Sequence, residues 1–424
     1  MMHQTKRMKL RNGIGLTCVT TNQSKTSCLS AMLALPLGEK ERSLSALLPF
    51  VLRGSCRDYP GQQAVAARLD ELYGARVEPV VRKRGEAQLI GFVADVIDER
   101  YAMQGEGLFA DTAKLLASLL LHPAAFTKEV VDREASQLCA KIAAQADDKT
   151  TWAIRRMYQH MCEGEAYSLS ELGESEEVKR ITPEQLTAQY HHVMRTAPLE
   201  LFYCGSLEPE QAACQLEQAM EAYTAPTEPV RPVFDAPRAP LHEGIREVIE
   251  EEPVVQGKLT IGLRSGITVF DDAYPAMVVF NACFGGNTAS RLFRTVREQM
   301  SLCYYATSMT EKTKGVIAVA SGIENDSEPQ ARAEILHQLE EIQQGGLTAE
   351  EVESAKRTVM ASLRTMFDSP LQLENFYQTQ AVAGLTETLD ELIERIGQVS
   401  MEDVTAAAQK AVPDTVYFLK GAGV

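Results

Sequence analysis

The same succession of segments occurs twice in this sequence. The apolar run "ALLPFVLRGS" and its counterpart "AMVVFNACFGGN", which begin about 230 residues apart, are each followed by a helical pattern and then by strand-like residues. Later, "FTKEVVDREASQLCAKI" is matched by "LTAEEVESAKRTVMASL", and "ITPEQLTAQYHHVM" by "VSMEDVTAAAQKAV". Thr182 and Ser400 are placed to cap the last helix of each half. The repeated order predicts a tandem duplication of an α+β unit of about 200 residues.

A proline-rich stretch separates the two copies. Residues 223–244 show no helical or strand periodicity, and proline stiffens and extends a connector. We therefore predict an N-terminal domain over residues 1–222, a linker over residues 223–244 and a C-terminal domain over residues 245–424. Two domains on a semi-rigid tether can enclose a cleft, which is where function is expected.

Composition argues against several classes of protein. The formal net charge of −16 repels nucleic-acid phosphate, and no cluster of lysine and arginine is interleaved with aromatic residues, so no nucleic-acid partner is expected. No segment approaches the roughly 18 apolar residues of a membrane span, and the start lacks the apolar core of a secretory signal. Nine scattered cysteines without a CxxC pair indicate free thiols. We expect a cytoplasmic protein that does not bind a membrane.

The most specific motif is "GGNTASRLFRTVREQMSLCYY", from Gly285 to Tyr305. Together with the opening "LRNGIGLTCV" and the "ALLPFVLRGS" segment, it resembles the pitrilysin family of metallopeptidases, which includes insulin-degrading enzyme and the mitochondrial processing peptidases. The resemblance extends over nearly the whole chain. It implies two pitrilysin-like domains, each a mainly antiparallel sheet with helices packed on one face.

Catalytic members of that family carry an inverted zinc motif, HxxEH, on a helix of the first domain. On the family's pattern the two histidines fall at Ser45 and Pro49, and the glutamate base falls at Leu48. The third ligand, counted from Glu134, falls near Lys141. A catalytic zinc usually takes three protein ligands with lone pairs, which these side chains do not supply. The resemblance thus implies no catalytic residue, no metal ligand and no cofactor in this chain.

The apolar run is then a former metal-binding helix that has been repacked as core. We expect it to bend or end near Pro49, because proline lacks an amide hydrogen and clashes with the preceding turn. The alternative is that this helix was never a metal site.

Active members complete their site from the second domain with an arginine and a tyrosine seven residues apart, and Arg297 and Tyr304 keep that spacing. Both side chains can donate hydrogen bonds to a peptide carbonyl and to the oxyanion formed from it. A purely structural role is the alternative, since an arginine in a last turn also favours the helix dipole. Ser301 stands where the family usually has glycine, so a different turn before Tyr304 is one alternative, and Tyr305 is a second candidate phenol.

Other nucleophiles and ligands find little support. His191 and His192 are adjacent and point in different directions on a helix, and the pair of His160 and Cys162 is too small for a metal site. No GxSxG nucleophile elbow occurs.

In heterodimeric relatives, one subunit holds the zinc, and the other lacks HxxEH but keeps the arginine and tyrosine. The resemblance implies that this chain is the second kind: a non-catalytic subunit that binds peptide or unfolded polypeptide and completes the active site of an HxxEH-bearing homologue, where the zinc resides. Peptide is expected to add as a strand to an exposed sheet edge. In the absence of that partner, a homodimer is the alternative.

Two other functions stay open at this point. One is a catalytically inert scaffold or assembly factor, for example in the aminopentanol-type modification of elongation factor P, with which a YfmF-type subgroup of inactive bacterial homologues is associated. The segments "ALLPFVLRGS" and "LDELYGA" resemble that subgroup. The other is an independent peptidase with a cryptic metal site, for which the ligands are lacking.

Overall fold

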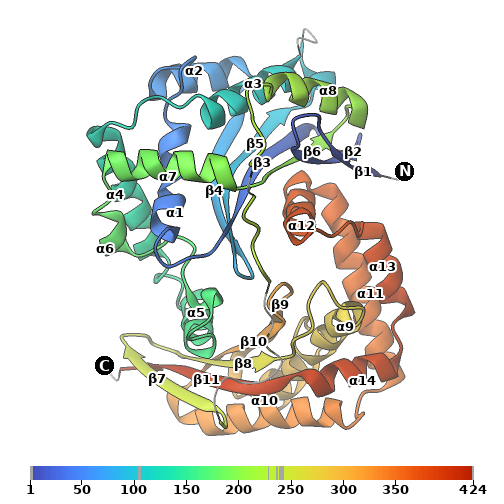
Figure 1. Ribbon diagram of the computed structural model, residues 1–424. Helices are drawn as coiled ribbons and strands as arrows, with labels where there is room; N and C mark the ends of the chain where they lie inside the picture. Colours follow the sequence, from blue (N-terminus) through green and yellow to red (C-terminus); the bar gives the residue numbers. More distant parts are fainter. Residues whose placement is uncertain (1–2, 104–106, 228, 235–236, 238–242, 423–424) are drawn as a thin grey trace. The chain divides into compact units, whose positions relative to one another are not determined.

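The structure is a computed structural model of the 424-residue chain, and it describes residues 3–103, 107–227, 229–234, 237 and 243–422. The chain forms two compact units, each assembled from three segments (Figure 1). Unit 1 comprises Met1–Ala143, Ser170–Val233 and Arg364–Thr388. Unit 2 comprises Ala144–Leu169, Phe234–Leu363 and Leu389–Val424.

Unit 1 is built on a six-stranded sheet with the order β1-β2-β6-β3-β5-β4. Its strands are β1 (Gln4–Lys9), β2 (Gly15–Thr20), β3 (Thr26–Pro36), β4 (Arg76–Arg84), β5 (Ala87–Ile97) and β6 (Leu199–Gly205). β2 and β6 are parallel, and every other neighbouring pair is antiparallel.

Unit 2 is built on a five-stranded sheet with the order β7-β11-β8-β10-β9. Its strands are β7 (Arg246–Glu252), β8 (Gly257–Arg264), β9 (Cys303–Glu311), β10 (Val316–Ile323) and β11 (Val412–Gly421). β7 and β11 are parallel, and the other pairs are antiparallel.

The two sheets have one topology. When β1 is set aside, β2 to β6 in the first sheet occupy the same positions, with the same directions, as β7 to β11 in the second. The last helix of each half carries the predicted cap, because Thr182 and Ser400 each form a capping box with the residue three positions on. The predicted duplication of a mainly antiparallel α+β unit is confirmed.

Helices surround both sheets. In the first half of the chain they are α1 (Arg42–Arg53), α2 (Gln62–Glu71), α3 (Leu108–Leu121), α4 (Lys128–Ala144), α5 (Lys149–Met161), α6 (Ser175–Val178), α7 (Pro183–Thr196) and α8 (Pro209–Ala219). In the second half they are α9 (Tyr274–Phe284), the π-helix η3 (Phe293–Gln299), α10 (Glu328–Gln343), α11 (Ala349–Thr365), α12 (Pro370–Ala383), α13 (Leu389–Gln398) and α14 (Met401–Lys410). Short 3₁₀ turns are η1 (Glu99–Tyr101), η2 (Ala166–Ser168), η4 (Asn325–Ser327) and η5 (Met366–Asp368).

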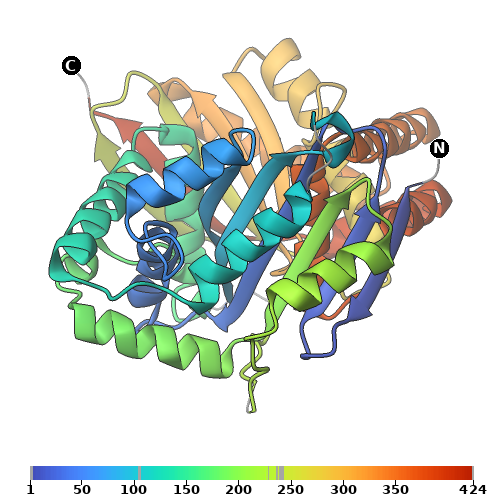
Figure 2. The ribbon, with the colours of Figure 1, turned by 90° about the horizontal axis from the view of Figure 1, so that it is seen from above.

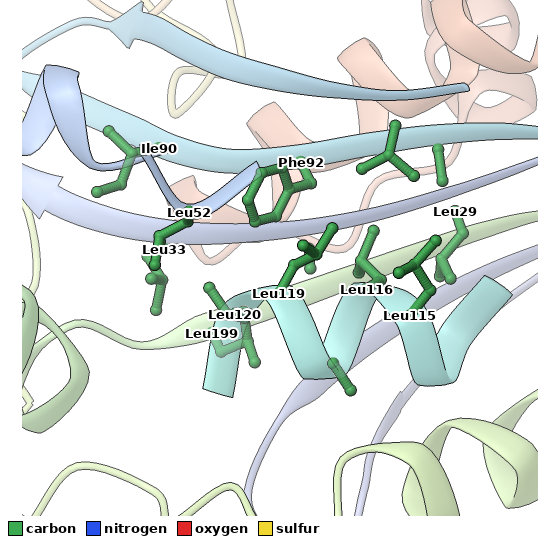
Figure 3. Close-up of a cluster of buried hydrophobic side chains, with 14 of the residues drawn as sticks. Leu29, Leu33, Leu52, Ile90, Phe92, Leu115, Leu116, Leu119, Leu120 and Leu199 are labelled. Atoms are coloured by element: carbon green, nitrogen blue, oxygen red, sulfur yellow. The ribbon is translucent and has the colours of Figure 1, made fainter. Parts of the chain in front are cut away.

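One face of the first sheet forms the apolar core of unit 1. Figure 2 shows α3 and α8 lying across this face. Leu29 and Leu33 of β3, together with Phe92 of β5, meet the leucines of α3, including Leu116 and Leu119 (Figure 3). Burial of one such side chain stabilises the fold by roughly 1.5–3 kcal/mol, so this face holds unit 1 together.

The opposite face of each sheet receives one helix from the other half of the chain. In unit 1, α12 packs on β3 and β6, where Gln378 Nε2 donates to Ser30 Oγ at 2.9 Å and Glu374 forms an ion pair with Arg82 at 2.6 Å. Ser30 alternates with Leu29 along β3, so it faces away from the apolar core. The prediction that helices pack on one face of the sheet is correct for the helices of the same half. It did not include the helix from the other half that covers the second face.

In unit 2, α5 packs on β8 and β11. The close approach depends on Gly262, where an added Cβ would lie 2.5 Å from the sulfurs of Met157 and Met161. Beside the helix, the buried Arg264 guanidinium lies 2.6 Å from Glu165, in the segment that follows α5, and 2.8 Å from Asp414 of β11. Exchange of α5 and α12 explains why neither unit is a continuous stretch of chain.

In the sequence, the predicted linker at residues 223–244 follows α8 and precedes β7. Residues 228, 235–236 and 238–242 of this stretch lie outside the described residues. In the described part, the Val230 amide donates to the Thr196 carbonyl at 2.9 Å.

Candidate functional site

The residues at the expected zinc-motif positions lie in the apolar core of unit 1. Ser45, Leu48 and Pro49 are all buried in α1, which continues through Pro49 to Arg53. Of the two expected outcomes, a bend or an end near Pro49, the helix end does not occur. Ser45 Oγ accepts a hydrogen bond from Gln189 Nε2 of α7 at 2.9 Å. Leu48 and Pro49 line a small apolar cavity with residues that include Leu33, Leu52, Ile90 and Leu120.

Lys141, at the expected third position, lies close to the same helix. It is exposed in the last turn of α4, and its Nζ lies 5.3 Å from the centroid of the Phe50 ring. A cation held against an aromatic ring repels a metal ion. Glu134, the carboxylate from which that position was counted, is buried and accepts from Arg133 Nε at 2.9 Å. The hydroxyl, aliphatic and ammonium groups at these positions do not fit a catalytic zinc.

In the described part of the chain, no group of three histidine, cysteine or acidic side chains could hold a metal ion. His191 and His192 are exposed on α7, whereas His160 lies 3.4 Å from Glu250 within a group of hydrogen-bonded side chains.

Arg297 and Tyr304 come from two contacting elements at one edge of the second sheet. Arg297 lies in the last turn of η3, and Tyr304 lies near the start of β9, the edge strand on which η3 packs. The charge of Arg297 also reaches Cys303: burial raises the pKa of the Cys303 thiol, and Arg297 acts in the opposite direction. The structure thus brings the two predicted residues to the same edge of the sheet.

The three arginines of the motif differ in their contacts. Arg291 forms an ion pair with Glu351 at 2.6 Å, and Arg294 lies 3.6 Å from the same carboxylate. Arg297 is exposed and stacks on Phe293, with its guanidinium carbon 4.5 Å from the ring centroid. Among the residues that the structure describes, no carboxylate lies within ion-pair distance of Arg297. The charge of Arg297 is therefore available to a group outside the chain. This exposure favours a binding role over a purely structural one.

Tyr304 is the extra residue of a β-bulge. Cys303 is paired with Ile323 and Tyr305 with Gly322, so Tyr304 has no partner opposite it on β10. A bulge re-aims a side chain and is common at sheet edges beside functional sites. The Tyr304 ring is 63% exposed, and its hydroxyl donates to Glu324 Oε1 at 3.1 Å, a contact that raises the pKa of the phenol.

Tyr305, the second candidate phenol, is engaged inside unit 2. Its hydroxyl donates to Thr150 Oγ1 of α5 at 3.1 Å, and Lys258 Nζ lies 5.7 Å from its ring centroid. Burial raises its pKa. The exposed phenol at this edge is therefore that of Tyr304.

The turn between η3 and β9 contains a left-handed residue. Ser301 has a φ of 53°, a conformation that glycine adopts without steric cost. Ser301 therefore has a backbone conformation that glycine favours, at the position where the family's pattern has glycine.

Sequence reasoning missed Glu324, the partner of the Tyr304 hydroxyl. The antiparallel pairing of β9 and β10 could have indicated this contact. In such a pair, the residues that follow β10 lie beside the start of β9. The bulge at Tyr304 changes that register locally, so alternation alone would have assigned the contact to the wrong residue.

A comparison with known proteins relates the whole chain to one family. The family model described as "Peptidase M16 inactive domain" matches residues 180–359. The Bacillus subtilis protein described as "Probable inactive metalloprotease YmfF" is 34% identical over 426 residues, which cover 99% of each chain. A second B. subtilis protein, "Uncharacterized zinc protease YmxG", is 27% identical over 37% of this chain and 38% of its own length.

The fold has a counterpart among solved structures. The crystal structure of a conserved protein from Enterococcus faecalis matches with a TM-score of 0.86 at 25% identity, over 99% of both chains. The resemblance to the pitrilysin family is thereby confirmed. This chain belongs to the peptidase M16 family of pitrilysin- and insulinase-like proteins, among the inactive homologues of its metallopeptidases.

Proposed function

We propose that this chain is the non-catalytic subunit of a heterodimeric M16 peptidase, in which it binds peptide and pairs with a zinc-bearing homologue. In this proposal the zinc and the catalytic base belong to the partner, since the residues at Ser45, Leu48 and Pro49 do not fit a metal. The chain contributes the Arg297 guanidinium and the Tyr304 hydroxyl to the peptide carbonyl and the developing oxyanion. For this, the Tyr304 hydroxyl exchanges its acceptor Glu324 for the peptide oxygen.

The observation that carries the proposal is the contrast within one motif. Arg291 and Arg294 both lie within ion-pair distance of Glu351. Arg297 has no such partner among the described residues, and it is exposed at the same sheet edge as Tyr304, the exposed residue of the bulge. A hydrogen-bond donor pair that is exposed at an edge strand suits an extended peptide, whose main chain can pair with that strand. The existence in B. subtilis of both an inactive relative and a zinc-protease relative gives the proposal its partner type.

The test is a reconstituted cleavage assay. The chain is mixed with the HxxEH-bearing homologue from the same organism, and cleavage of a quenched fluorescent peptide is measured. We expect Arg297→Ala and Tyr304→Phe to lower kcat/KM by about 10²–10³, the usual effect of removing one oxyanion donor. Arg294→Ala, in the same motif, is the matched control and should leave the rate nearly unchanged.

Two results would overturn the proposal. Cleavage at the wild-type rate by both variants, with the complex still formed in size-exclusion chromatography, would favour the scaffold or assembly role, including one in elongation factor P modification. Peptide cleavage by the isolated chain together with stoichiometric zinc would favour an independent peptidase.

A further inference from the structure

The duplicated topology leaves one sheet edge uncovered in unit 2. β2 and β7 occupy equivalent positions, each parallel to the strand that follows the last helix of its half. In unit 1, β1 pairs antiparallel along the outer edge of β2, from Gln4 opposite Thr20 to Lys9 opposite Gly15. In unit 2, no described strand pairs with the outer edge of β7.

The strand that covers this edge in unit 1 is basic. β1 contains Lys6, Arg7 and Lys9, and two of these cations reach carboxylates on neighbouring elements. Lys6 pairs with Glu210 of α8, and Arg7 pairs with Glu200 of β6 at 3.0 Å. Unit 1 thus shows how a basic strand is held at this position of the fold.

The uncovered edge in unit 2 is acidic, with an apolar side chain at its centre. Glu247, Ile249 and Glu251 alternate along β7 and therefore share one face of the sheet. Ile249 is 65% exposed, and the side chains of Glu247 and Glu251 remain 58% and 64% exposed even though Arg332 and Lys420 approach them. The alternate residues Glu250 and Glu252 point to the other face, where they pair with side chains of α5.

Pairing of β7 with a second copy of itself is disfavoured. An antiparallel pair centred on Ile249 would place Glu247 of one copy opposite Glu251 of the other, and like charges directly opposite destabilise a sheet. Charged residues at an edge strand are also a common protection against edge-to-edge aggregation. The edge of β7 therefore disfavours pairing with the same edge of a second copy, and its charge is complementary to that of a basic strand.

We propose that the outer edge of β7 binds an extended, basic segment of a partner polypeptide, which adds to the second sheet as β1 adds to the first. Because side chains alternate along a strand, the segment that fits has cations at positions i and i+4, to face Glu247 and Glu251. At i+2 it has a side chain whose carbon chain can cover Ile249, and Arg7, Lys9 and Arg11 have this spacing in the N-terminal segment. This surface is separate from Arg297 and Tyr304, so the inference does not depend on the proposed function.

The test uses the basic strand of this protein as the probe. A fluorescently labelled peptide with the sequence of residues 3–11, HQTKRMKLR, is titrated into the full chain, and binding is followed by fluorescence anisotropy. We expect saturable binding that weakens as salt screens the charges. The Glu247→Lys/Glu251→Lys double variant should weaken it at least tenfold.

Two controls separate strand addition from simple charge attraction. The Glu340→Lys/Glu394→Lys variant makes the same change of charge at exposed positions of α10 and α13, and it should bind like the wild type. The same peptide with every backbone nitrogen methylated keeps every cation but has no amide hydrogen to donate along either edge, and it should bind at least tenfold more weakly.

Three outcomes would overturn the inference. Absence of saturable binding at low salt would mean that the charged edge only prevents aggregation. Equal binding of the methylated peptide would mean unspecific ion attraction. Binding that the Glu247 and Glu251 substitutions do not affect would mean that the peptide occupies another surface, such as the β2 edge after displacement of β1.

Discussion

Three side chains converge on the carboxylate of Glu250, a residue of β7 on the face toward α5. Tyr417 donates its hydroxyl at 2.7 Å, Arg156 Nε donates at 3.2 Å, and His160 Nε2 lies at 3.4 Å. Burial alone would raise the pKa of Glu250, but these hydrogen bonds outweigh it and hold the pKa at about 2, against 4.5 for the ordinary group. The carboxylate therefore binds its proton more weakly in the folded state than in the unfolded state.

This difference predicts a loss of stability in acid. Since the folded pKa is the lower one, the contribution of Glu250 is complete above pH 4.5 and is lost as the pH falls from 4.5 toward 2. A shift of this size would correspond to about 3 kcal/mol for a fully shielded group, and the 30% exposure of the side chain reduces our expectation to about 1–2 kcal/mol. Urea unfolding at several pH values measures it.

Replacement of Glu250 isolates its share of that pH dependence. Glu250→Gln should lower the free energy of unfolding at pH 6 by that amount and flatten its dependence on pH between 2 and 4.5. The exposed Glu298→Gln serves as control and should keep the wild-type profile. A Glu250→Gln profile that is parallel to the wild type would contradict the assignment.

At the scale of elements, α1 has apolar packing where the family's pattern places a metal-binding motif. Ser45, Leu48 and Pro49 are buried against β3, β5, α3 and α7, and the cavity beside Leu48 is lined almost entirely by apolar side chains. Reintroduction of the family's glutamate at that position would bury a carboxylate that has no designed partner. Burial of an unpaired charge is costly, although the group can relieve part of the cost by taking up a proton.

We therefore predict that Leu48→Glu lowers the free energy of unfolding by about 3 kcal/mol or more at pH 7. Leu48→Met, which conserves volume, should cost less than about 1.5 kcal/mol. Denaturant unfolding followed by circular dichroism compares the two. A Leu48→Glu variant as stable as Leu48→Met would show that the helix still tolerates the charge, and that its repacking as core is incomplete.

The order of elements could be predicted from the sequence because it depends on local signals. The capping residues Thr182 and Ser400, the apolar runs and the repeated spacing each report on a few neighbouring residues, and each was confirmed. The sequence left open whether the helix bends or ends near Pro49, since tertiary packing of an apolar helix can override the preference of one residue, and α1 continues to Arg53.

The exchange of α5 and α12 could not be predicted in the same way. A helical pattern shows that a helix has a buried side, but it does not say which sheet receives it. α12 presents Gln378, Thr379 and Gln380 as buried residues, a polar set that resembles an exposed surface in the sequence. The site was predictable as far as Arg297 and Tyr304, because a motif carries those residues, whereas the bulge at Tyr304 and its contact with Glu324 depend on register.

At the scale of the whole molecule, the exchange makes each half of the chain insufficient for its own unit. The fragment of residues 1–222 lacks α12, which contacts β3 and β6 through Tyr377 stacked on Phe202 and through the pair of Arg82 and Glu374. The fragment of residues 245–424 lacks α5, which covers Thr260 and Gly262.

We predict that neither fragment folds cooperatively alone and that the two fragments, when co-expressed, copurify with the circular dichroism of the intact chain. A control fragment of residues 1–222 with residues 364–388 appended through a flexible linker should recover part of the cooperative thermal transition, since it restores α12. A sharp transition and a monomeric profile for unmodified 1–222 would contradict the prediction.

The place of α12 in the sequence also has a consequence for synthesis on the ribosome. Ser30 and its hydrogen-bond partner Gln378 are 348 residues apart. At typical translation speeds that separation corresponds to roughly 20–70 s. During this interval β3, and β6 once it has emerged, lack the helix that covers their second face. We therefore expect the nascent N-terminal half to depend on a chaperone. A truncated product that ends before residue 370 would keep that face bare, which makes premature termination late in the gene nearly as damaging as termination early.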